Sequence, residues 1–299
     1  MLNVYEQVDR NKRRSAVIIF LFTVFVTTVI YFIGRAFGYG SAFIGWALIV
    51  SGLTSFFGYW YSDKIILSIS GARPANREQD FLFYTVVENL SLAAGVPVPA
   101  LYVIDDSAPN AFATGRDVNH AVVAVTTGLL EKLNRTELEG VVAHELSHIK
   151  NYDMRLMSVV VVLVGMITLI SDWLLRSSFT RKKSQEENSG GSLIVLIGFA
   201  LALLSPLIGK LIQLSLSRQR ESLADANAVL FTRQPSGLIS ALKKISADIE
   251  PLEVANKATA PLYIINPLKG EEGRVDWFAN LFNTHPPIEK RIEALEQTL

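Results

Sequence analysis

Four apolar runs constrain the fold of this chain most strongly. A helix needs about 20 mostly apolar residues to cross a bilayer, and runs of this kind or nearly this length occupy residues 16–33, 41–61, 156–171 and 192–209. Hydrophobic residues make up 50% of the 299 residues, yet 19% are charged. We therefore expect a multi-pass membrane protein that also carries a substantial polar domain.

The first two runs predict an uncleaved membrane hairpin. Four basic residues lie within residues 10–14, before the first run, whereas the short turn 34–40 holds only Arg35. A basic flank before an apolar run is also typical of a signal peptide, but no convincing small-residue cleavage site follows and the second run comes at once. The positive-inside rule places the N-terminus and everything after Lys64 in the cytoplasm.

The third and fourth runs are expected to cross the membrane as a second hairpin. The third run is short and ends at Asp172, and Pro206 interrupts the fourth. The segment between them is basic, so two crossings would place positive charge on the outer side, against the usual tendency. The alternative is a shallow hairpin that does not fully cross the bilayer.

The remaining residues predict a mainly α-helical domain with a small β-sheet. Residues 76–94 have helical periodicity, with Phe81 on the apolar face and a glycine directly after the last residue. Thr136 and Glu139 have the spacing of a capping box at the start of another helix. Residues 287–299 form a third amphipathic pattern.

Two short β-rich runs, 100–104 and 121–126, are separated by the turn-rich segment 105–119. Together with the apolar runs, these patterns divide the chain into four segments. They are an N-terminal membrane hairpin (1–64), a first half of the polar domain (65–155), a second membrane hairpin (156–209) and a second half of the polar domain (210–299).

Residues 144–148, His-Glu-Leu-Ser-His, form an HExxH motif on a predicted helix. Residues four apart lie on one helix face, so the imidazoles of His144 and His148 can bind one Zn²⁺. Glu145 projects near the metal without binding it and can accept a proton from activated water. The alternative is an ordinary surface helix that carries two histidines and a glutamate.

A catalytic zinc site needs a third protein ligand and one open position. The metzincin class is excluded, because Asn151 and Met154 stand where it requires glycine and histidine. The best candidate is Glu221, and Asp225 one turn later can orient a ligand histidine. If the helices beside the apolar runs are continuous, Glu221 and the motif lie at a similar height, roughly 12–18 Å from the membrane. A Glu and an Asp at this spacing can equally form a solvated helix face.

With residues 110–115 (Asn-Ala-Phe-Ala-Thr-Gly) and the segment 285–287 (His-Pro-Pro) before Arg291, these motifs resemble the HtpX-type heat-shock membrane proteases of bacteria. They are more distantly similar to the CAAX prenyl endopeptidases and the mitochondrial Oma-type proteases, all of them gluzincins. The resemblance covers nearly the whole chain and implies that Glu221 is the third zinc ligand.

The same resemblance implies a function and a location. It implies a zinc endopeptidase with one Zn²⁺ per chain, whose gluzincin-like domain lies in the cytosol. The apolar runs, the charge asymmetry and the helix geometry predict multi-pass insertion and an active site that faces the cytoplasm. The resemblance implies the plasma (inner) membrane and a role in stress response and protein quality control. The implied substrates are polypeptides, above all misfolded or damaged membrane proteins.

The residues of the other two motifs have a functional and a structural interpretation each. Asn110, Ala111, Phe112 and Ala113 can form an edge to which an extended substrate adds by main-chain hydrogen bonds, or a turn that leads into a strand. His285 can stabilise the oxyanion of a tetrahedral intermediate or be structural. Arg291, in the predicted C-terminal helix, can be a surface charge.

Charge and composition exclude several classes. The formal net charge of zero gives no electrostatic case for nucleic acid, and the absence of cysteine excludes disulfides and a thiolate zinc site. A transport or scaffold protein with a structural zinc site would not need Glu145, and Asp172 is the one marginal charge in its spans. An inactive relative that binds unfolded membrane proteins is the third interpretation, against which the intact His-Glu-His set argues.

Overall fold

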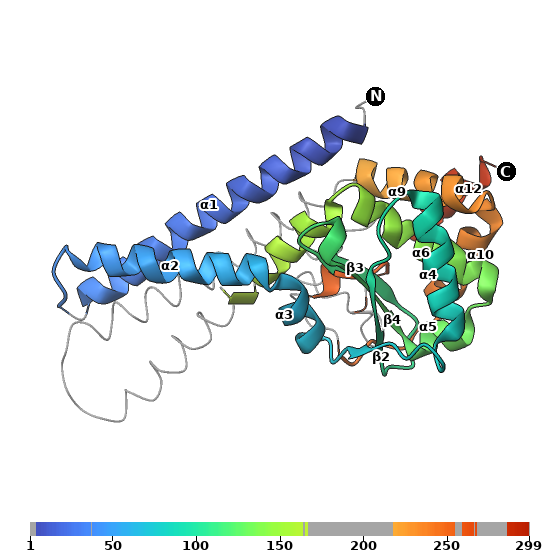
Figure 1. Ribbon diagram of the computed structural model, residues 1–299, viewed down its shortest axis with the longest axis horizontal. Coiled ribbons are helices and arrows are strands. Elements are labelled where there is room, and N and C mark those ends of the chain that lie inside the picture. The colour runs from blue at the N-terminus through green and yellow to red at the C-terminus, as the bar shows by residue number, and fades with distance from the viewer. Residues whose placement is uncertain are drawn as a thin grey trace.

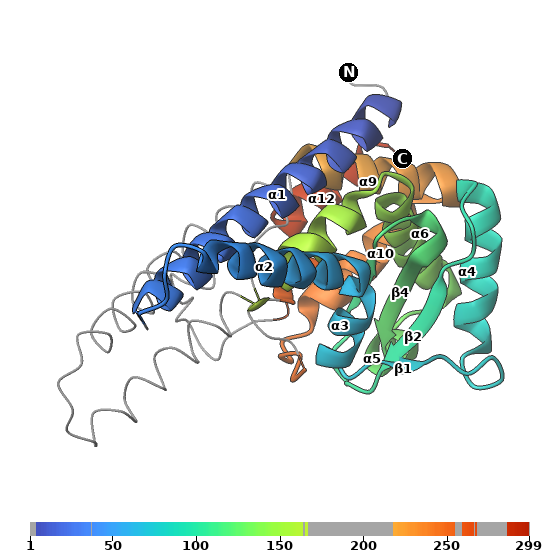
Figure 2. The ribbon, with the colours of Figure 1, turned by 60° about the vertical axis from the view of Figure 1, so that its left-hand side comes forward.

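Two long apolar helices and a body of helices around a small sheet make up the portion of the chain that the computed structural model describes (Figure 1). The described residues are 4–36, 38–163, 165–166, 218–254, 259–265, 267 and 286–298. The two long helices extend away from the body, whereas the N-terminal end of the first one returns to it (Figures 1 and 2).

The first two apolar runs are helices, as predicted. α1 (Val4–Ala36) and α2 (Phe43–Trp60) contain stretches of 25 and 18 residues that are long and apolar enough to cross a membrane. Small buried residues on α2 allow the close approach that membrane helices favour. Hydroxyl groups bridge the two helices, with Thr27 Oγ1 2.5 Å from Ser51 Oγ and Thr23 donating to Ser55 at 2.8 Å.

The third apolar run lies only partly within the described residues. Residues 153–163 and 165–166 are helical, and the side chains of 156–163 are buried. The remainder of this run, the fourth run and the basic segment between them lie outside the described residues. The choice between two crossings and a shallow hairpin therefore stays a prediction.

The sheet is mixed and has the order β1-β2-β4-β3. β2 and β4 are parallel, with Ala100 opposite Val122, and β3 is antiparallel to β4, with Ala111 opposite Val125. β2 and β4 have the bounds predicted for the two β-rich runs. The strands are β1 (Arg73–Pro74), β2 (Ala100–Ile104), β3 (Ala111–Gly115) and β4 (Ala121–Thr126).

Segment 105–119, which was expected to be rich in turns, also contains the strand β3. All five β3 residues are buried, and β3 contacts the helix that carries the HExxH motif. Alanine and glycine have weak strand propensity, so pairing with β4 and burial against that helix determine the strand. β3 lies at one edge of the sheet.

α4 (Phe81–Ala94) ends as predicted, since Gly95 adopts the left-handed conformation at φ 69° that closes a helix. Its predicted start at residue 76 is wrong. The Asn76 side chain instead accepts hydrogen bonds from the backbone of Glu78 and Gln79 in a turn. Phe81 is 65% exposed, so it does not belong to the buried face.

α6 (Arg135–Lys150) is the central helix and carries the HExxH motif. Its capping box is formed by Asn134 and Glu137, not by Thr136 and Glu139 as predicted. The Asn134 side chain accepts from the Glu137 N–H at 3.0 Å, and Glu137 Oε2 accepts from the Asn134 N–H at 2.8 Å. The two boxes differ by two residues in register.

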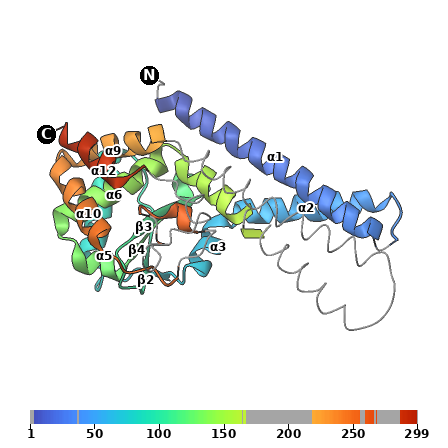
Figure 3. The ribbon, with the colours of Figure 1, turned by 180° about the vertical axis from the view of Figure 1, so that it is seen from behind.

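α6 is enclosed by the sheet on one side and by α4, α9 and α10 on others, which buries the motif (Figures 2 and 3). Gly140 permits this closeness, because a Cβ there would lie 2.6 Å from the backbone nitrogen of Leu238 on α10. α12 matches the predicted C-terminal helix. The other helices are α3 (Ser62–Ile69), α5 (Thr127–Lys132), α9 (Arg218–Thr232), α10 (Pro235–Ala247) and α12 (Ile288–Glu296).

Candidate metal centre

Three buried side chains from two helices meet at the centre of the body. His144 and His148 lie one turn apart on α6, and Glu221 faces them from α9. The two histidine Nε2 atoms are 3.2 Å apart, and Glu221 carboxylate oxygens lie 3.7 Å from His144 Nε2 and 3.5 Å from His148 Nε2. The structure thus brings together the three side chains that were predicted to bind the metal.

The spacing of these atoms suits a tetrahedral metal ion. Two ligands at zinc distances of 2.0–2.1 Å lie roughly 3.3 Å from each other in a tetrahedron. The two imidazole nitrogens, 3.2 Å apart, match that value, and with a single Glu221 oxygen as the third ligand atom all three atoms lie within 4.8 Å of one another. Imidazole nitrogen and carboxylate oxygen are also ligand types that zinc accepts. The residues present therefore fit the metal on both geometry and chemistry.

His144 is held by a carboxylate that a buried arginine in turn holds. Asp225 Oδ1 lies 2.9 Å from His144 Nδ1, and Arg291 donates to both oxygens of Asp225 at 2.9 and 2.7 Å. An Arg291 nitrogen also lies 3.3 Å from His144 Nδ1. Because the Asp225 carboxylate can only accept, we assign the proton to Nδ1, and the guanidinium then acts on Asp225 rather than on the ring.

His148 is held by a second carboxylate, which the sequence analysis missed. Asp153 Oδ2 lies 3.3 Å from His148 Nδ1, and Asp153 Oδ1 receives hydrogen bonds from Arg220 at 3.3 Å and Asn11 at 2.7 Å. Asp153 follows directly after the turn that ends α6. A carboxylate close behind a metal-binding helix is the signal that could have indicated it.

The electrostatic field at the centre favours positive charge. Burial lowers the pKa of His148, but the hydrogen bond with Asp153 and the charges of Glu221 and Glu145 raise it to about 9. Burial raises the pKa of Asp225, but Arg291 and His144 outweigh burial and lower that pKa to about 2. A divalent cation satisfies the same field while both imidazoles stay neutral, as metal ligands must be.

Glu145 lies beside the three side chains and is 2% exposed. It lines a pocket together with His148, Asp153 and Ala113, and with the apolar side chains Met154, Met157, Pro261 and Leu262. Glu145 therefore borders the open space next to the ligand cluster, at the position that the motif predicts for the proton acceptor.

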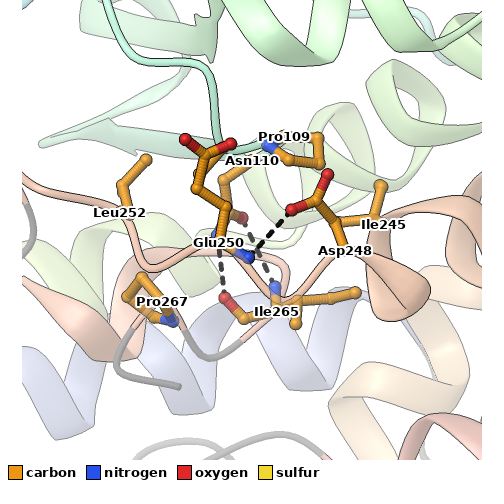
Figure 4. Close-up of a pocket in the computed structure, with 9 residues that line it drawn as sticks. Pro109, Asn110, Ile245, Asp248, Glu250, Leu252, Ile265 and Pro267 are labelled. Carbon is orange, nitrogen blue, oxygen red and sulfur yellow. Dashed lines mark hydrogen bonds between the residues drawn. The ribbon is translucent and has the colours of Figure 1, made fainter. Parts of the chain in front are cut away.

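The candidates for a substrate edge divide into two groups. Ala113 lines the pocket beside Glu145. Phe112 packs edge-on against Tyr263 with ring centroids 5.1 Å apart, and Asn110 donates to the Ile265 carbonyl at 3.0 Å. Asn110 borders a different pocket, which shares no lining residue with the first (Figure 4).

The remaining predictions for single residues have clear outcomes except one. Glu221 and Asp225 are buried, so the interpretation as a solvated helix face is wrong, and Arg291 at 3% exposure is not a surface charge. His120, a histidine outside the motif for which no role was predicted, is half exposed and pairs with Asp117. His285 lies outside the described residues, and its role as an oxyanion donor stays a prediction.

A buried His-His-Glu cluster with a neighbouring glutamate in a pocket defines a metal-dependent hydrolase. Comparison with known proteins agrees with this class. Residues 82–299 match Peptidase family M48. The chain is 47% identical over 293 residues to a Protease HtpX homolog of Dictyoglomus thermophilum, covering 97% of this chain and 93% of the relative. It is 43% identical over 298 residues to a Protease HtpX homolog of Thermoanaerobacter pseudethanolicus, covering 98% and 97%.

The crystal structure of S. mikatae Ste24p has a similar fold, with a TM-score of 0.52 at 16% identity, over 98% of this chain and 67% of that one. The chain belongs to Peptidase family M48 and is a membrane-bound metalloprotease of the HtpX group. The family and the His144, His148 and Glu221 cluster together imply a metal ion, zinc in this family.

Proposed function

We propose that this chain is an endopeptidase that cuts misfolded or damaged membrane proteins at the cytoplasmic face of the plasma (inner) membrane, with one Zn²⁺ per chain. The observation that carries the proposal is the cluster of His144, His148 and Glu221, whose ligand atoms lie within 4.8 Å of one another, beside Glu145. A structural zinc site needs four closed ligands, whereas the part of the chain that the structure describes supplies three here, beside a pocket.

The proposed roles follow from the chemistry of each side chain. Zinc, when bound by His144, His148 and Glu221, supplies Lewis acidity toward a water molecule and the scissile carbonyl. Glu145 accepts the proton of the attacking water and delivers it to the leaving amine. Asp225 accepts the Nδ1 hydrogen of His144 and Asp153 that of His148, so both Nε2 lone pairs face the metal.

The outer edge of β3 is proposed to hold the substrate main chain. Asn110 pairs with β4 through its carbonyl, which accepts from the Thr126 N–H at 3.0 Å, whereas the Ala111 carbonyl points the other way and accepts from Ile264 at 3.0 Å. Because antiparallel pairing alternates, the N–H and C=O of Ala113 point to the outer side as well. An extended peptide can pair there, which places its scissile carbonyl in the pocket that Glu145 lines.

The proposed topology keeps the division made from the sequence. α1 and α2 form the membrane hairpin of residues 1–64, and residues 65–155 and 210–299 build one peptidase body around α6 and α9. The basic residues before the first apolar run support a cytoplasmic N-terminus. Asn11, near the N-terminal end of α1, donates to Asp153, which lies against His148; this contact supports a cytoplasmic location for the metal centre too.

Metal removal and return test the proposal. Detergent-purified protein is stripped with a chelator and supplied with zinc, and cleavage of an unfolded membrane protein is followed for wild type and Glu221→Ala. We expect zinc to restore cleavage in wild type, and Glu221→Ala to bind zinc weakly and to cut little. If the wild-type protein binds zinc but cuts no polypeptide, the proposed endopeptidase activity is wrong. The alternative of a transport or scaffold protein with a structural zinc site would then be favoured.

A further inference from the structure

The membrane helix α1 reaches the metal centre through one buried side chain. Asn11, 1% exposed, donates from its amide nitrogen to Asp153 Oδ1 at 2.7 Å and to the Asn151 carbonyl at 3.0 Å. Asp153 presents its other oxygen to His148 at 3.3 Å. Two hydrogen bonds thus connect a helix of the membrane hairpin with a metal-ligating histidine.

The orientation of this amide is fixed by its surroundings. Both neighbours of the Asn11 nitrogen, a carboxylate and a carbonyl, can only accept hydrogen bonds, so the nitrogen and not the oxygen must face them. The next residue of α1 contacts the same turn, because the Lys12 ammonium lies 4.5 Å from the centre of the Tyr152 ring. Tyr152 has a positive φ of 58°. α1 therefore holds the turn from which Asp153 projects.

We propose that Asn11 is a positioning residue for the metal centre: it fixes the rotamer of Asp153, and Asp153 in turn orients His148 toward the metal. This inference rests on the proposed function, in which His148 is a ligand. α1 is then a component of the metal site's architecture as well as a membrane anchor.

A packing role alone does not explain the contact with Asp153. Packing of α1 on the turn is served by the bond to the Asn151 carbonyl and by the Lys12–Tyr152 contact. Asp153 is 2% exposed, and a buried carboxylate group requires hydrogen-bond donors to replace the water that it has lost. Asn11 and Arg220 supply donors to Oδ1, which leaves Oδ2 directed at His148.

The test measures zinc affinity by competition with a chelator, in one detergent, for wild type, Asn11→Ala and Asn11→Asp. Ser15→Ala is the matched control, because Ser15 is equally buried one turn further along α1, and within the described part of the chain its hydroxyl donates to the Asn11 carbonyl alone. We expect Asn11→Ala to weaken zinc binding roughly tenfold, as is typical of residues behind metal ligands. Asn11→Asp should weaken it further, because two carboxylates then face each other, and Ser15→Ala should leave it unchanged.

A double-mutant cycle separates positioning from general destabilisation. In an Asp153→Ala background, Asn11→Ala should have no further effect on zinc affinity, because Asp153, through which Asn11 acts on His148, is already absent. If its effect persists there, or if Ser15→Ala weakens zinc equally, Asn11 is structural and the inference is wrong. If wild type itself binds no zinc, the proposed function fails instead, so the two failures are distinguishable.

Discussion

The two histidines of the metal centre stand one turn apart on the same helix, yet different regions of the chain hold them. His144 is oriented by Asp225, which Arg291 grips with two hydrogen bonds of 2.9 and 2.7 Å. His148 is oriented by Asp153 at 3.3 Å, and Asp153 depends on single contacts from Arg220 and Asn11.

The two histidines are therefore not equivalent. The arm of His144, formed by Asp225 and Arg291, lies wholly in α9 and α12 of the peptidase body and is a bidentate buried ion pair, which is a strong and directional arrangement. In the arm of His148, formed by Asp153, Arg220 and Asn11, the contacts of Asp153 with His148 and Arg220 are longer, at 3.3 Å each, and the arm ends on a membrane helix. We expect the first arm to govern the stability of the body and the second to govern metal affinity through α1.

The largest effect is expected from Arg291→Met, which leaves the buried Asp225 carboxylate unpaired. Loss of one partner of a buried pair costs about 3–5 kcal/mol, and the thermal unfolding midpoint in detergent measures it. Arg220→Met is the matched change in the other arm, where the loss should be smaller because Asn11 still donates to Asp153. If Arg291→Met and Arg220→Met lower the unfolding midpoint equally, the two arms do not differ in their contribution to stability.

Asp153→Asn should separate metal affinity from stability. The amide can still accept the Asn11 and Arg220 bonds through its oxygen, but it no longer offers a charged acceptor to His148. We expect zinc affinity to fall roughly 10–100-fold. The unfolding midpoint of the metal-free protein should fall less than in Arg291→Met, because the amide oxygen still accepts the Arg220 hydrogen bond. A large drop in that midpoint with unchanged zinc affinity would contradict the assignment of this arm.

Acid should weaken the arm of His144. The folded pKa of Asp225, about 2, lies below its ordinary value of 3.8, despite burial, because of Arg291 and His144. A lowered folded pKa stabilises the protein above the unfolded pKa, and this contribution, about 2 kcal/mol, is lost as pH falls from about 4 to 2. Unfolding midpoints of wild type and Asp225→Asn should differ most at pH 7 and converge toward pH 2. A constant difference would show that this carboxyl does not titrate as described.

The smallest effect is expected at the N-terminus of α6, the helix that carries both histidines. Asn134→Ala removes the cap of α6, which costs about 1 kcal/mol of stability, while both histidines keep their partners. Thr136→Ala, at the position that the sequence suggested, should cost less. If Thr136→Ala proves the more destabilising change, the cap is misassigned.

Local patterns in the sequence were sufficient for much of this site. HExxH places two histidines on one face whatever the fold, and Glu221 and Asp225 share a face because they are four residues apart. The apolar runs likewise predict α1 and α2 from length and composition. By contrast, the capping register, the start of α4 and the strand β3 depend on small differences in packing, which propensity alone does not resolve.

The sequence does not predict the two arms in full, because their contacts join residues that are far apart in the chain. Arg291 meets Asp225, and Asn11 meets Asp153, across more than sixty and more than a hundred residues of chain. Nothing in the local sequence around Asn11 distinguishes it from the polar flank of a membrane span. Such contacts follow only from the packing of α1, α6, α9 and α12 around one centre.

Zinc content and polypeptide cleavage, measured on the same samples of wild type and Glu145→Gln, test whether Glu145 is the base of a zinc protease. The side chain of glutamine keeps the shape of glutamate but cannot accept the proton. We predict that Glu145→Gln retains zinc as wild type does and loses roughly 10²–10⁴-fold in cleavage rate. Cleavage at the wild-type rate by zinc-loaded Glu145→Gln would contradict the assignment of Glu145 as the base.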